Sequence, residues 1–224
     1  MSARGLVTFG AALALLGVAA CAAEPTAPEG YTSMCDGDIL RLVEGFRPAK
    51  DVDYLAFRRD DVVYSPGATE AGVTTTTLER RGTPCATAKD KGACESALAR
   101  ARALVGSCYG TPIAPKFKVP EEGAPDPKRT CTATYLVFTR GDEVGLVVSD
   151  ADVRSFFGAI DSPQEAAYVA QRGGENVTCQ TTPAMRAAYA VLAEGIGIVA
   201  QGAAEPRIVR VAPDGTVSLV ADGK

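Results

Sequence analysis

The cysteines constrain this chain more than any other feature of its sequence. Seven occur in 224 residues, and the first of them, Cys21, directly follows an apolar N-terminal stretch. The other six are Cys35, Cys85, Cys94, Cys108, Cys131 and Cys179. An odd number of cysteines in an oxidising compartment leaves one thiol to be explained, whereas six can all pair. The sequence therefore predicts a disulfide-stabilised fold in which Cys21 has a separate role.

Residues 1–20 have the pattern of a secretory signal peptide. Arg4 supplies the positive charge, and the apolar stretch behind it is broken by glycines and is too short to span a membrane. The small residues directly before Cys21 resemble a bacterial lipobox, which implies that Cys21 becomes the first residue and carries a lipid. Ordinary cleavage near Cys21 without modification is the alternative. We expect residues 21–33 to form a lipidated tether.

Charge excludes some classes of partner. Loss of residues 1–20 removes one of 23 basic residues and none of 27 acidic ones, so the exported chain has a net charge of about −5. Such a chain is poorly suited to binding nucleic acid or to docking on anionic lipid through a basic face. Attachment to a membrane would then depend on the lipid at Cys21. No dinucleotide or P-loop motif is present, and no cofactor is expected.

The first half of the exported chain predicts a helix, a small antiparallel meander and two further helices. Apolar residues at helical spacing favour a helix over 36–46. Residues 53–67 resemble two short strands around a turn at 59–61, and 72–81 is a third strand. Thr83 and Pro84 are typical of a helix start, with an interruption at Gly92.

A further helix is expected to run continuously from Cys94 to Cys108. It would separate these two cysteines by about 21 Å, beyond the reach of a disulfide. Cys85 is therefore the expected partner of Cys94. Cys131 is the expected partner of Cys108, because closing the loop over the proline-rich segment 109–130 has the lowest entropic cost.

The second half shows sharper local signals. A hairpin is expected around Gly141–Asp142, followed by helices capped by Ser149 and Ser162. Residues 176–180 are a strand candidate, 184–202 fit either a helix or, as we prefer, a hairpin, and 207–221 fit a hairpin around residues 213–215. The predicted fold class is α+β: antiparallel β hairpins and a meander with several short helices, in a single domain over residues 34–224. A subdivision near 109–130 is the alternative.

Three segments of the chain resemble a family of uncharacterised bacterial exported proteins, many of them predicted lipoproteins. The segments are 47–59, 80–99 and 135–170, which contain a Thr-Pro-Cys helix start, a strand-Arg-Gly-Asp-strand turn and a Ser-Pro-Gln-Glu helix cap. The resemblance extends from about Leu42 to Val220. It implies an exported domain and carries no known activity.

Candidate chemistry is sparse. The chain has no histidine, which excludes Ser-His-Asp and Cys-His catalysis and histidine metal sites. Cysteine-only zinc is disfavoured, because no C-x-x-C spacing occurs, and no metal site is expected. Three acidic pairs are formal candidates for carboxylate catalysis: Asp60 with Asp61, Glu121 with Glu122, and Asp150 with Asp152.

The remaining motifs favour ordinary structural roles. Arg140-Gly141-Asp142 is typical of a hairpin turn rather than an integrin ligand, and the sequon at Asn176 requires a eukaryotic export route. Helical spacing indicates that Phe156 and Phe157 belong to the core.

The functional prediction is a lipid-anchored protein of the bacterial cell envelope, at the outer membrane and facing the periplasm or the surface. We expect a non-enzymatic binding or accessory protein, with an envelope protein or a small ligand as its partner and segment 109–130 as the contact surface. The alternative is a carboxylate-dependent hydrolase of envelope polymers.

Overall fold

The computed structural model describes residues 28–64, 72–103, 129–180, 186–202 and 206–220. These residues form a mixed α+β fold with more strand than helix. Its elements in chain order are β1 (Thr32–Ser33), β2 (Cys35–Asp36), β3 (Ile39–Leu40), a 3-10 turn η1 (Val43–Gly45), β4 (Tyr54–Tyr64), β5 (Gly72–Gly82), α1 (Lys91–Arg100), β6 (Arg129–Arg140), β7 (Glu143–Val147), α2 (Asp150–Phe157), α3 (Pro163–Arg172), β8 (Ala188–Leu192), β9 (Gly195–Gln201), β10 (Pro206–Val211) and β11 (Val217–Leu219).

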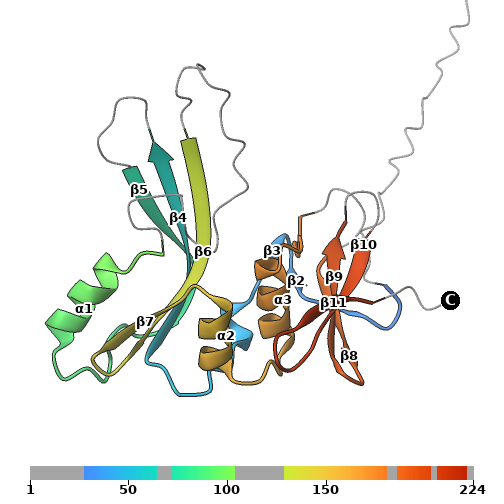
Figure 1. Ribbon diagram of the computed structural model, residues 1–224. Coiled ribbons are helices and arrows are strands. Elements are labelled where there is room, and N and C mark those ends of the chain that lie inside the picture. Colours follow the sequence, from blue (N-terminus) through green and yellow to red (C-terminus); the bar gives the residue numbers. More distant parts are fainter. Residues whose placement is uncertain (1–27, 65–71, 104–128, 181–185, 203–205, 221–224) are drawn as a thin grey trace, which may run out of the picture.

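Two antiparallel sheets and a short hairpin organise these elements. One sheet has the strand order β5-β4-β6-β7, the other β1-β8-β9-β10-β11, and β2 pairs with β3. In Figure 1 α1 lies beside the four-stranded sheet, α3 beside the five-stranded sheet, and α2 between the two sheets. One hydrophobic cluster joins them, since it contains Leu55 and Leu136 from the first sheet together with Ile198 and Val209 from the second.

A group of aromatic side chains forms part of this cluster. The rings of Phe46 and Phe157 are 5.2 Å apart between centroids, and those of Phe156 and Phe157 are 4.9 Å apart. Tyr168 of α3 contacts the same group edge-on. The prediction that Phe156 and Phe157 pack in the core is confirmed.

The central strand β4 corrects the prediction of two short strands around a turn at residues 59–61. β4 runs without a break from Tyr54 to Tyr64, because β5 and β6 pair with it on both sides. Asp60 lies opposite Thr75 and Ala133 in this register and is fully buried. Its carboxylate accepts hydrogen bonds from the Thr75 hydroxyl (2.6 Å) and the Tyr135 hydroxyl (3.0 Å). Tertiary hydrogen bonding thus overrides the local turn signal.

The helix expected over residues 36–46 is also wrong. The chain there forms the β2–β3 hairpin and the single 3-10 turn η1. Glu79 of β5 accepts hydrogen bonds from the backbone N–H groups of Leu42 and Val43. A side chain of a distant strand thus supplies the acceptors that a longer helix would otherwise provide. Leu42 and Val43 are still buried, so the apolar pattern identified core residues in the wrong secondary structure.

The helix around Cys94 begins slightly earlier than expected and ends well before Cys108, because α1 spans Lys91–Arg100. Asp90 caps α1 by accepting from the N–H of Ala93, Gly92 lies inside the first turn, and the chain becomes extended at Ala101. The separate short helix expected to start at Thr83 is wrong, because Cys85, with φ at +55°, has left-handed backbone that a helix cannot contain. The predicted Cys85–Cys94 disulfide is present, with Cα atoms 6.0 Å apart.

Elements with strong local signals form as predicted. Ser149 and Ser162 each complete a capping box, with Asp152 and Glu165 at the third helical position. The hairpins β6–β7, β8–β9 and β10–β11 are all formed, which settles residues 188–201 in favour of strands. The strand expected at 176–180 is wrong: only one bridge, from Asn176 to Gln201, forms there.

A second disulfide, Cys35–Cys179, connects the start of the described chain to the segment after α3, with Cα atoms 5.6 Å apart. Cys108 lies outside the described residues, and only the backbone of Cys131, in β6, is described. The predicted Cys108–Cys131 bond therefore stays a prediction.

Candidate ligand-binding groove

A groove of about 330 Å³ lies where the β2–β3 hairpin, the four-stranded sheet and the chain after α3 meet. We call it the hairpin groove, and it is lined by residues 38–42, 57, 78–79, 171 and 177–180. Its volume is at the lower end of the range for small-ligand sites, about 300–1,000 Å³. Two other clefts, described below, have volumes that fall short of that range.

The walls of the hairpin groove are fixed by interactions that link distant segments. The Cys35–Cys179 disulfide holds the hairpin against residues 177–180. On the opposite side, the Glu79 carboxylate accepts from Leu42 N–H at 3.0 Å and Val43 N–H at 3.0 Å, which fixes the turn after β3 against β5. A groove held by covalent and charge-assisted contacts loses little conformational entropy on binding.

Apolar side chains form the floor and two points of the rim. Phe57 and Val177 are buried in the floor. Ile39 and Leu78 are 49% and 43% exposed. They come from different elements, β3 and β5, and both line the same groove. The rim therefore offers two apolar contacts over an apolar floor.

Every charged side chain that lines the hairpin groove already has an intramolecular partner. Asp38 pairs with Arg186 at 3.5 Å, and Arg41 pairs with Asp36 at 3.8 Å. Glu79 is used by the two backbone N–H groups described above. The groove therefore has no charged side chain that lacks an intramolecular partner.

The remaining polar side chains of the groove are neutral amides and a hydroxyl. Gln171 donates through Nε2 to the carbonyl of Val177 at 2.8 Å, which orients its amide oxygen. Thr178 accepts from the N–H of Gln180, whose side chain is exposed. Neutral groups of this kind suit hydrogen bonding to amides or hydroxyls.

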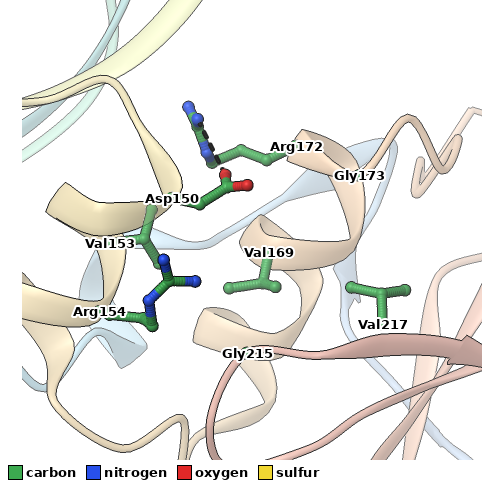
Figure 2. Close-up of a pocket in the computed structure, with 8 residues that line it drawn as sticks. All are labelled: Asp150, Val153, Arg154, Val169, Arg172, Gly173, Gly215 and Val217. Carbon is green, nitrogen blue, oxygen red and sulfur yellow. Dashed lines mark hydrogen bonds and ion pairs between the residues drawn. The ribbon is translucent and has the colours of Figure 1, made fainter. Parts of the chain in front are cut away.

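A second cleft, between α2, α3 and the β10–β11 turn, carries two arginines (Figure 2). Arg172 donates to the carbonyl of Val148 at 2.9 Å and pairs with Asp150 at 3.4 Å, while the Arg154 guanidinium is turned toward the cleft. The volume is only about 100 Å³, below the range for organic ligands. Because the cleft is too small for an organic ligand, we do not regard it as the main site.

A third cleft of about 140 Å³ contains part of the Arg-Gly-Asp turn. Arg140 pairs with Glu143 at 2.8 Å, the Gly141 N–H donates to Asp53 at 3.0 Å, and Asp142 accepts from the N–H of Asp90 at 3.0 Å. Hydrogen bonds from Thr87, and from the Gly141 backbone, lower the pKa of Asp53 against a smaller opposing effect of burial. The tripeptide is thus a hairpin turn with all three residues in use, as predicted.

The two acidic pairs that lie in the described part of the chain do not form a catalytic arrangement. Asp60 and Asp61 are consecutive strand residues and point to opposite faces of the sheet. Asp150 and Asp152 line different clefts. Glu121 and Glu122 lie outside the described residues.

The shifted carboxyl pKa values do not match a general acid in a cleft. Burial acts to raise the pKa of Asp152, but hydrogen bonds from Ser149 and Val148 bring it below its usual value. Burial raises the pKa of Glu165 despite three backbone N–H donors, yet this side chain is fully buried and lines none of the three clefts. Glu165 is a helix cap, because it accepts from the N–H groups of Arg47, Asp161 and Ser162.

The hairpin groove was missed from the sequence. Its residues come from five separate segments and share no motif, so only tertiary contacts bring them together. The predicted sites at Cys21 and in most of segment 109–130 lie outside the described residues, apart from residues 129–130 at the start of β6.

Within residues 28–220, over the ranges that the structure describes, no helix is long and apolar enough to cross a membrane. In the same ranges no group of three or more cysteine, aspartate or glutamate side chains is placed to hold a metal ion. No protein-family model matches the chain, and neither a curated protein nor a solved structure is significantly similar to it.

Proposed function

We propose that this protein is a lipid-anchored binding protein of the cell envelope that recognises a partner or small ligand through the hairpin groove. The observation that carries the proposal is the groove itself, a fixed cavity of about 330 Å³ with an apolar floor and with all its charged side chains paired. Such a site supplies contact area and neutral hydrogen-bonding groups without a free acid, base or nucleophile. Binding without catalysis is the function that it supports best.

The location rests on the N-terminal sequence and on the disulfides. Disulfides persist in oxidising compartments, so the bonds Cys35–Cys179 and Cys85–Cys94 indicate an extracytoplasmic environment. The lipobox-like residues before Cys21 support lipid attachment there. We propose residence at the outer membrane, in line with the resemblance to exported lipoproteins.

The anchor is tested with Cys21→Ala in the source bacterium or a lipoprotein-processing host. We expect loss of palmitate incorporation and release of the protein from membranes. Palmitate labelling that persists in Cys21→Ala would overturn the anchor.

The binding role is tested by photocrosslinking in whole cells. A benzophenone amino acid at position 78 should yield one discrete crosslinked species, whereas the same probe at position 191 should not. Val191 is the matched control because it is an apolar β-strand residue that is 80% exposed and lies outside the groove. Equal crosslinking patterns at both positions would overturn the groove as the binding site.

A further inference from the structure

We infer that the hairpin groove binds an extended polypeptide segment, which adds as a strand beside β3 and seats one uncharged apolar side chain between Ile39 and Leu78. This inference rests on the proposed function, because it uses the same groove. It adds the chemical class of the partner and its backbone geometry.

The first argument is charge. A site for an anion or a cation keeps a compensating charge unpaired or places it in the cavity. In the hairpin groove, Asp38 and Arg41 are paired within the chain and Glu79 is used by backbone N–H groups. A neutral segment would leave all of these contacts in place.

The second argument is the free edge of β3. Within the described residues, β3 pairs with β2 alone, through Ile39 opposite Asp36 and Leu40 opposite Cys35. A strand with one neighbour leaves backbone N–H and C=O groups on its other side, and an added strand satisfies them. Both β3 residues line the groove, so the free edge and the apolar floor belong to the same site.

The third argument distinguishes a polypeptide from an acyl chain. An acyl chain has no use for hydrogen-bonding groups and is best served by a wholly apolar cavity. This groove carries the amides of Gln171 and Gln180 and the hydroxyl of Thr178 around its apolar floor. Amide side chains can donate to the carbonyl groups and accept from the N–H groups of a peptide backbone. The exposed Ile39 and Leu78 can pack against one apolar side chain placed between them.

The experiment selects peptides on the full exported chain from a displayed library of random heptapeptides. Enriched peptides should share one apolar residue flanked by uncharged residues. Leu78→Asp and Leu78→Lys should each weaken binding of a synthesised peptide by at least about tenfold, whichever charge is introduced. Val191→Asp is the control and should leave the affinity within about twofold. Because Leu78 and Val191 are exposed, all three variants should keep the wild-type circular dichroism spectrum.

Amide hydrogen exchange supplies a second readout. The bound peptide should slow exchange in residues 39–41, where the new strand would pair, and not in β11 at the far edge of the other sheet. Binding without protection of residues 39–41 would overturn strand addition.

A parallel titration uses a fluorescent sixteen-carbon fatty acid. If the fatty acid binds and Leu78→Asp abolishes that binding while no peptide is enriched, the peptide class is wrong and the groove proposal survives. If peptides bind and the Leu78 variants have no effect, both the inference and the groove are wrong. Failure of both probes to bind would also overturn both.

Discussion

Removal of the Cys35–Cys179 disulfide should destabilise this protein more than removal of Cys85–Cys94. The first bond closes a loop with a sequence separation of 144, and the second closes one of only 9. In the loop-entropy description the cost grows with the logarithm of loop length, which gives about 5 kcal/mol for the long loop and about 2.7 kcal/mol for the short one. The difference, about 2.4 kcal/mol, depends on loop length alone.

The comparison uses two double variants, Cys35→Ala with Cys179→Ala and Cys85→Ala with Cys94→Ala. Each exchange removes two sulfur atoms, and three of the four cysteines are buried to a similar extent, which makes the short-loop variant a matched control. Urea unfolding, followed by far-ultraviolet circular dichroism without reductant, gives the free energy of unfolding of each. If the two variants lose the same stability, or the short-loop variant loses more, the entropic reasoning is refuted.

Three further predictions concern single groups. Gly82→Ala should cost about 3 kcal/mol of unfolding free energy in urea titration, because φ is +77° and a Cβ there would clash with the Asp53 carbonyl oxygen. Wild-type stability of Gly82→Ala would refute this explanation of the glycine. Asp60→Asn should lower the unfolding free energy by about 3 kcal/mol, since it removes a buried carboxylate that accepts hydrogen bonds. Asp61→Asn, on the other face of the sheet, should lower it by under about 1 kcal/mol. Equal losses for the two variants would contradict the difference in burial. Burial raises the pKa of Tyr135 and Tyr168 to about 12. The stability that their neutral forms provide is therefore complete below pH 10 and is lost as pH rises from 10 to 12, by about 1.4 kcal/mol per pH unit for each tyrosine. Unfolding free energies that stay constant over this interval would disprove the raised pKa values.

Local signals in the sequence predicted those parts of the fold that local interactions determine. Ser149 and Ser162 cap their helices with acids three residues later, and Gly141–Asp142 closes a two-residue hairpin. In each case the donor and acceptor are within a few residues of each other, so the sequence contains the whole interaction.

The errors arose where a distant residue decides the outcome. Asp60 looks like a turn residue until Thr75 and Tyr135 bond its carboxylate inside the sheet. The apolar spacing after Cys35 predicts a helix, but the Glu79 carboxylate binds the backbone N–H groups of Leu42 and Val43 and stabilises a single 3-10 turn instead. The candidate site depends wholly on such contacts, since the hairpin groove brings together β3, β5 and the chain after α3. No spacing rule within one segment contains that information.

The Cys35–Cys179 bond also determines how the protein would respond to mechanical force. A pull between the two ends of the chain reaches Cys35 after β1, crosses the sulfur bridge and continues from Cys179. The four-stranded sheet and the helices α1, α2 and α3 lie within the covalent loop and are not part of that path. Tension on an N-terminal tether would therefore extend the hairpins after Cys179, while the chain between the two cysteines cannot be extended by that pull.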